Sequence, residues 1–169
     1  MRDIRVTSRY GQTFVSWKDV AAGEEGAKYR YRLYRSDQPI TADNIKQAEL
    51  CFHGVLNNSA RLFGTSFTMK DRLDAPKPYS VLEEGGKPLP PWSGLAVHTV
   101  RKEGKAYYAV VAVDEKTQAM SRVVPGKSAT TEAIEEKVAP IQPIKLYDSK
   151  SRGTDCQDFD SATFATEDG

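Results

Sequence analysis

The side chains best suited to nucleophilic chemistry are few and widely scattered in this chain. There are two cysteines, Cys51 and Cys156, and two histidines, His53 and His98. A Cys-His pair at positions 51 and 53 would need a third group to orient the imidazole, and neighbours two residues apart on a strand do not supply one. The sequence contains no Gly-x-Ser-x-Gly elbow and no phosphate-binding loop. It therefore predicts no catalytic residue, and the protein is not expected to be an enzyme as this chain alone.

Carboxylates near residue 160 offer the donor atoms of a metal site. Asp155, Asp158 and Asp160, together with Glu167, supply oxygen ligands of the type that calcium takes. Their spacing lacks the glycine that lets a calcium-binding loop turn sharply. A solvated tail is the favoured interpretation, so we expect neither a bound metal nor another cofactor.

Aromatic residues on a long loop are a better lead to a binding surface. Residues 71–92 are poor in apolar side chains and rich in Pro and Gly, which indicates a long surface excursion. Trp92 follows Pro90 and Pro91 there, and Tyr79 lies on the same loop. A tryptophan beside prolines presents a flat, rigid surface suited to stacking on a sugar or docking a partner. The alternative is that Trp92 folds back and caps an open end of the domain.

Length and charge limit the classes of function. A chain of 169 residues is expected to form one domain with a tail. The net charge of +1 gives no field that would attract nucleic acid or an acidic membrane, and no apolar run is long enough to span a bilayer. The first residues lack the apolar core of a signal peptide, which fits a cytoplasmic protein or a fragment without its signal. Whether Cys51 and Cys156 pair is left open, because two distant thiols do not define a disulfide framework.

The pattern of apolar residues is that of an all-β chain. Its most regular stretch, residues 105–114, predicts a strand with Ala106, Tyr108, Val110 and Ala112 inward and Tyr107 and Val111 outward. A short helix is predicted over 42–49, with Thr41 as its N-cap. Arg30, Arg32 and Arg35 would form a basic strip or, as is favoured, belong to a solvated sheet face. Further strands are predicted at 4–8, 13–17, 28–36, 52–55, 60–63, 66–69, 94–100 and 119–124.

About seven short strands separated by turns predict an immunoglobulin-like antiparallel β-sandwich. Over residues 3–132 the sequence resembles a fibronectin type III domain. Trp17 matches the central tryptophan of that family's second strand, and residues 31–36 and 107–114 resemble its third and sixth strands. One departure is that Ala106 occupies the position at which the family usually carries its corner tyrosine. Residues 120–121 are similar to the start of the seventh strand.

The resemblance implies a domain organisation and a role. The sandwich of residues 3–132, with the inserted helix and long loop, would be followed by an extended Pro-containing linker over 133–146 and an irregular tail over 147–169. Members with such insertions are similar to accessory modules of large extracellular bacterial hydrolases, which implies a secreted, periplasmic or cell-surface location. The expected partner is a neighbouring domain or chain of the same protein. The alternative partner is a polysaccharide or cell surface bound through Trp92 and Tyr79.

Overall fold

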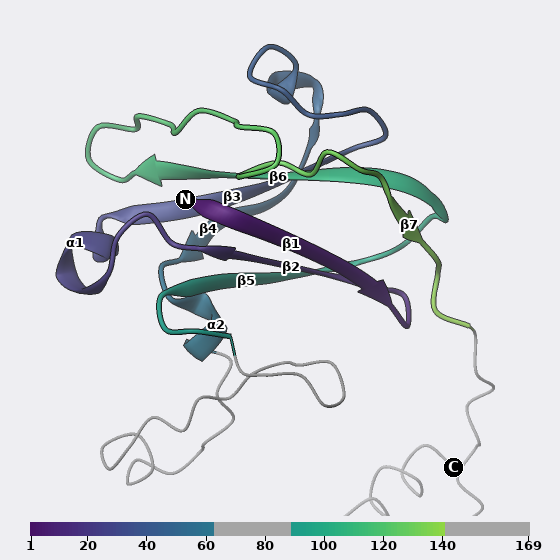
Figure 1. Cartoon of the computed structure of the whole chain (residues 1–169), viewed down its shortest axis with the longest axis horizontal. Helices are drawn as coiled ribbons and strands as arrows, with labels where there is room; N and C mark the ends of the chain where they lie inside the picture. Colours follow the sequence, from purple (N-terminus) through teal and green to yellow (C-terminus); the bar gives the residue numbers. More distant parts are fainter. Residues whose placement is uncertain (63–88, 141–169) are drawn as a thin grey trace, which may run out of the picture. The chain divides into compact units, whose positions relative to one another are not determined.

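The computed structural model describes residues 1–62 and 89–140, which fold into two antiparallel sheets (Figure 1). One sheet has the strand order β1-β2-β5, and the other has the order β4-β3-β6-β7. The predicted all-β antiparallel sandwich is confirmed. Its strands are β1 (Arg2–Arg9), β2 (Gln12–Lys18), β3 (Tyr29–Ser36), β4 (Glu49–Leu56), β5 (Ser93–Thr99), β6 (Gly104–Asp114) and β7 (Ile134–Glu136).

Alternate residues of the strands fill the space between the two sheets, as a period of two residues requires. Trp17 of β2 is only 2% exposed and packs against Tyr31 of β3, with ring centroids 5.4 Å apart. Burying side chains of this size stabilises a fold by about 1.5–3 kcal/mol each, so this core is the main source of stability. Its buried members are Val15, Trp17, Tyr31, Leu33, Ala96, Ala106, Tyr108, Val110 and Ala112.

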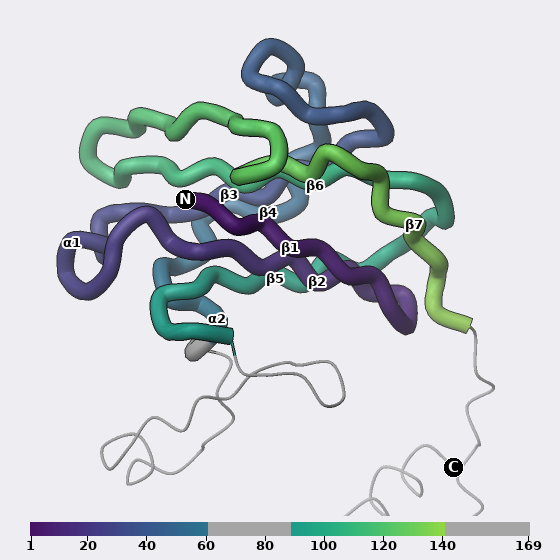
Figure 2. The backbone as a smooth tube through the Cα atoms, in the orientation of Figure 1, coloured from purple at the N-terminus to yellow at the C-terminus, as the bar shows by residue number. Residues whose placement is uncertain are grey.

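Strand β6 is buried on both faces. Its inward residues are those that the sequence predicts, but Val111, predicted to face outward, is 0% exposed. A second apolar cluster covers this outer face, and it includes Ile40 and Ile45 from one segment and Val123 and Ala129 from another. Figure 2 shows both connecting segments on the side of β6 that faces away from β1, β2 and β5. The segments that join the strands therefore form a third layer.

The predicted helix over 42–49 is wrong except for one turn. The chain forms a 3-10 helix, η1 (Ile45–Gln47), and β4 begins at Glu49. The reason is local. The Asn44 side chain accepts a hydrogen bond from the Thr41 amide (2.7 Å) and donates one to the Pro39 carbonyl (2.9 Å). These bonds satisfy the backbone with a turn, in competition with a longer helix.

Two further short helices differ from expectation. α1 (Gly23–Ala27) lies between the strands predicted at 13–17 and 28–36, and α2 (Ser59–Leu62) occupies the described part of the strand predicted over 60–63. The Ser59 hydroxyl donates to the Leu95 carbonyl (3.2 Å) and accepts from the Leu95 amide (2.9 Å). This exchange joins the start of α2 to β5. The strand predicted at 66–69 lies outside the described residues.

The chain after β6 follows a different path from the predicted last strand over 119–124. Its residues touch β6 through isolated bridges and single bonds, such as Ser121 N to Ala112 O (2.8 Å) and Val110 N to Ser128 O (2.8 Å). Pro125, which has no backbone N–H, interrupts the segment. The regular strand comes later, as β7, within the predicted linker over 133–146. Residues Met1–Ala139 consequently form one compact unit.

Candidate functional site

Four polar side chains meet at the end of the sandwich where β7 pairs with the start of β6. The Glu136 carboxylate, whose side chain is 0% exposed, lies at the centre of this group. Arg35 donates to its Oε2 through Nε (2.9 Å) and Nη2 (2.6 Å). Thr13 Oγ1 donates to Oε1 (2.7 Å), and the Tyr108 hydroxyl donates to the same oxygen. We call Thr13, Arg35, Tyr108 and Glu136 the exit cluster.

The exit cluster keeps a buried carboxylate ionised. Burial raises the pKa of Glu136, but the hydrogen bonds from Tyr108, Arg35 and Thr13 outweigh it and hold the pKa below the ordinary value. Burial, followed by the bond to the ionised Glu136, raises the pKa of Tyr108 well above its usual range. The Tyr108 hydroxyl therefore stays protonated and acts as a donor. This bond places Tyr108, two residues after Ala106, in contact with a side chain of β7.

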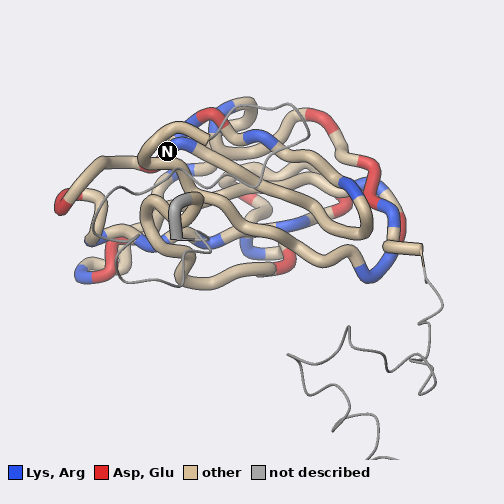
Figure 3. Tube along the Cα trace, turned by 90° about the horizontal axis from the view of Figure 1, so that it is seen from below, with Lys and Arg blue, Asp and Glu red and all other residues tan. Residues whose placement is uncertain are grey.

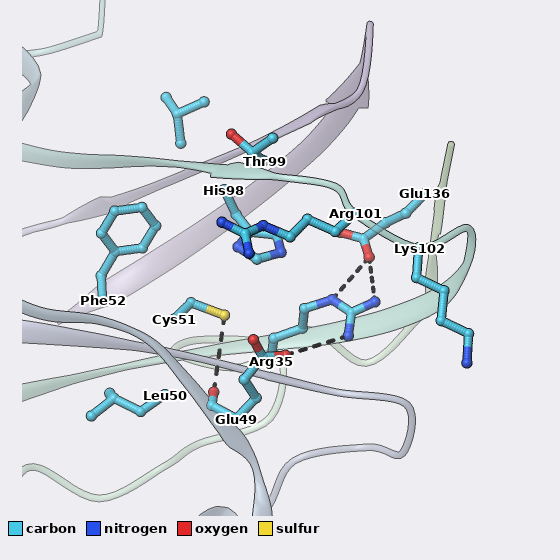
Figure 4. Close-up of a pocket in the computed structure, with 11 residues that line it drawn as sticks. Arg35, Glu49, Leu50, Cys51, Phe52, His98, Thr99, Arg101, Lys102 and Glu136 are labelled. Carbon is cyan, nitrogen blue, oxygen red and sulfur yellow. Dashed lines mark hydrogen bonds and ion pairs between the residues drawn. The ribbon is translucent and has the colours of Figure 1, made fainter. Parts of the chain in front are cut away.

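A pocket of 610 Å³ opens beside the exit cluster, between the edge strands β4 and β5 (Figure 4). Cys51 and Phe52 contribute from β4, and His98 from β5 lies edge-on to Tyr108 with ring centroids 6.2 Å apart. Arg101 and Lys102, from the turn that follows β5, complete the lining together with Arg35, Glu49 and Glu136. A smaller hollow of 440 Å³ shares Arg35, Glu49 and Lys102 with this pocket.

Cys51 and His53 do not form a nucleophile pair. In the ladder between β3 and β4, Phe52 faces Leu33 and Leu50 faces Tyr34, so Cys51 is the extra residue of a bulge. Cys51 packs on the core, where burial raises the pKa of its thiol to about 12. His53 is exposed, and its Nε2 lies 3.5 Å from Nη2 of Arg32 and not beside Cys51. A thiol that stays protonated is a poor nucleophile.

The three third-strand arginines do not share one face. Arg30 pairs with Glu115 (3.0 Å), and Arg32 approaches His53 and the Met120 sulfur (3.8 Å). Arg35 points inward to Glu136 instead. Figure 3 shows basic and acidic residues interspersed along the described chain, with both signs present near residue 140. The third strand therefore carries no basic strip.

A second polar group, the entry cluster, lies at the opposite end of β2 and includes Asp19, Asn58 and Trp92. Asp19 Oδ2 accepts from the Asn58 amide (2.6 Å), and Asn58 Oδ1 accepts from the Trp92 amide (3.0 Å). The Trp92 carbonyl accepts from the Asp19 amide (3.0 Å) and closes the ring. Burial raises the pKa of Asp19, although the bond from Asn58 opposes this change.

Two buried polar atoms at the entry cluster lack a hydrogen-bond partner. Among the described side chains, Trp17 Nε1 and Asp19 Oδ1 are buried without a partner in hydrogen-bond geometry. The Trp17 indole still lowers the pKa of Asp19, as does the Tyr31 hydroxyl. That hydroxyl donates to Asn57 Oδ1 (3.1 Å) and accepts from the Val20 amide (2.9 Å).

Of the four predicted contact residues, Trp92 belongs to the entry cluster, and Pro90 and Pro91 directly precede it. Pro90, Pro91 and Trp92 are exposed and directly precede β5. Trp92 has a positive φ of 62° and a residue exposure of 37%. Its backbone is fixed by two hydrogen bonds, while its ring is outside both apolar clusters. Tyr79 lies outside the described residues.

The part of the chain that the structure describes contains no candidate metal site. No group of three or more His, Cys, Asp or Glu side chains within residues 1–62 and 89–140 is placed to hold an ion. Asp155, Asp158, Asp160 and Cys156 fall outside these ranges. Within the same ranges, no helix is long and apolar enough to cross a membrane.

Comparison of this chain with protein-family models, curated proteins and solved structures found no match. The fold and the two polar clusters are therefore the features of the molecule that bear on its function. The exit cluster is the part that sequence reasoning missed. A signal for it was present, because Arg35 continues the inward series of Tyr29, Tyr31 and Leu33, and a cation on a core face requires a buried partner.

Proposed function

We propose that this chain is a non-catalytic module that spaces, orients or docks the domains of a larger exported hydrolase. The observation that carries the proposal is the position of its entry and exit. Arg2 pairs with Lys18 at one end of β2, whereas Ala139 lies against Gly11, just before the other end. The seven residues of β2 separate these points by about 20 Å. Figure 1 shows the N-terminus and the end of the segment after β7 well separated, and neighbouring domains joined at such points would be held apart.

The strand order supports a fibronectin type III-like module. In a constant-type immunoglobulin domain, the fourth strand joins the sheet of the first, second and fifth strands. Here β4 pairs with β3 instead, in the sheet that contains β6 and β7. This arrangement is the one expected of the fibronectin type III class, to which the motifs around Trp17 and Tyr108 also point.

The exit cluster supports a mechanical role. A three-residue strand such as β7 gains little from its own ladder, yet Glu136 ties it to β2, β3 and β6 through three side chains. Tension on the chain at residue 140 is opposed by this buried ion pair and by the packing of Ala139 against Gly11. The segment leading to a following domain is therefore anchored in the core rather than at the surface.

The test uses the protein encoded by the complete reading frame. Replacing residues 1–139 by a Gly/Ser linker of the same length is expected to leave turnover of a small soluble substrate unchanged. Turnover of a polymeric substrate should fall severalfold, because a flexible linker keeps no fixed distance between the flanking domains. The spacer proposal fails if no hydrolase domain is encoded or if both activities are unchanged.

The position of Trp92 supports a second candidate function, that of a carbohydrate- or cell-surface-binding module. The residue is 37% exposed and two hydrogen bonds hold its backbone in place, and such preorganisation lowers the cost of stacking on a sugar. Trp92→Ala is expected to reduce retention on insoluble polysaccharide about tenfold. Tyr10→Ala is the matched control, because Tyr10 is 86% exposed at the opposite end of β2. Equal retention of both variants and the parent chain would exclude this role for Trp92.

A further inference from the structure

The pocket beside the exit cluster is suited to a ligand because its walls are of two kinds. Phe52 gives the β4 side an aromatic surface beside Cys51 and Glu49, and the other side carries polar and charged groups from β5 and the turn after it. Its volume of 610 Å³ lies within the range of about 300–1,000 Å³ that is typical of small-molecule sites. Figure 4 shows the Arg101 side chain reaching back over the pocket from this turn.

The charges lining the pocket are incompletely matched. Glu136 is engaged by Arg35 in a bidentate contact, and Glu49 lies 3.7 Å from the same guanidinium. Arg35 is therefore the ion-pair partner of both carboxylates. Arg101 and Lys102 are exposed and make no ion pair with the described residues. With three cations and two carboxylates, the lining has one net positive charge.

We infer that this pocket binds a small organic carboxylate with an apolar or aromatic body. The carboxylate would lie against the Arg101 guanidinium, which Figure 4 shows on the Phe52 side of the pocket, and the body would pack on Phe52. An arginine fork matches the planar geometry of a carboxylate, and Lys102 contributes only to the net positive charge of the lining. Inorganic phosphate fits less well, because its second negative charge would face Glu49 and Glu136. This inference is independent of the spacer role and concerns the opposite end of the sandwich from Trp92.

The test is a titration of the isotopically labelled full chain with benzoate, followed by NMR of the backbone amides. Saturable shifts are expected at Cys51, Phe52, His98 and Thr99, which surround the pocket. Benzamide, which has the same ring without the charge, should give none. N-acetylphenylalanine and galacturonate distinguish a peptide source of the carboxylate from a sugar source. The first should bind more tightly, because its ring can pack on Phe52.

Variants identify the cations responsible. Arg101→Gln should weaken benzoate binding about tenfold, the effect of losing one charge-assisted hydrogen bond. Lys102→Gln should have a smaller effect, because the Lys102 side chain points away from Arg101 (Figure 4). Lys116→Gln is the matched control, since it removes an exposed cation from the turn at the far end of β6. The inference is overturned by the absence of saturable shifts, by equal binding of benzamide, or by unchanged affinity in the double variant of Arg101 and Lys102.

Discussion

Replacing Glu136 by alanine is expected to destabilise the folded domain by about 3–5 kcal/mol, the usual cost of breaking a buried ion pair from one side. The substitution leaves Arg35, whose side chain is only 21% exposed, with Glu49 alone at 3.7 Å. It also removes the acceptor for the hydroxyls of Thr13 and Tyr108. A loss of this size is a large fraction of the 5–15 kcal/mol typical of domains. Urea denaturation followed by circular dichroism measures it.

The neighbouring residue provides the matched control for this prediction. Glu135 lies on the same short strand, but its side chain is 71% exposed and its pair with Lys137 is loose, at 3.9 Å. Glu135→Gln should change the free energy of unfolding by less than about 0.5 kcal/mol. Glu136→Gln should fall between the two, because an amide still accepts from hydroxyls but carries no charge for Arg35. Equal losses at positions 135 and 136 would show that the exit cluster adds no stability.

The same carboxylate predicts a dependence of stability on pH. The pKa of Glu136 in the folded state is lower than its ordinary value of 4.5, so the unfolded chain binds this proton more readily. The contribution of Glu136 is therefore complete above pH 4.5 and is lost as the pH falls through the lowered folded pKa. In Glu136→Gln this part of the acid dependence should disappear, which equilibrium unfolding at a series of pH values can measure.

Gly94→Ala is expected to cost about 3 kcal/mol, at the upper end of the range for overpacking a core. Gly94 faces Trp17 across the ladder of β2 and β5, and a Cβ at position 94 would overlap the Trp17 indole ring. The ring has no room to retreat, because Trp17 is 2% exposed and packed on Tyr31. Thermal and urea unfolding of the variant give the change in stability.

A double-mutant cycle separates this overlap from a general effect of alanine on β5. Trp17→Phe removes part of the ring that the new Cβ would meet, at a cost of its own. In the Gly94→Ala, Trp17→Phe double variant, the total loss should be smaller than the sum of the two single losses by at least about 1 kcal/mol. Additive losses would mean that position 94 is sensitive for a reason other than Trp17.

The sequence pattern was sufficient to predict which residues face the core wherever apolar and polar residues alternate regularly. The inward faces of β2, β3 and β6 follow from a period of two residues, and Trp17, Tyr31 and Val110 all occupy the core positions that this period predicts. The same reasoning failed over 42–49, where the hydrogen bonds of Asn44 decide between a helix and a turn. It also failed over 119–124, because irregular bonds to β6 leave no signature of alternation.

The candidate sites divide in the same way. The sequence alone determined that the domain is an antiparallel β-sandwich and that Trp92 follows two prolines before a strand, since both are properties of neighbouring residues. Only the tertiary structure decided that Glu136 belongs to the core and that Arg101 and Lys102 border a pocket. Arg35 and Glu136 are 101 residues apart in the chain, and no local pattern encodes a contact at that separation. It exists because β3 and β7 both lie beside β6, which brings the two charges together where water is excluded.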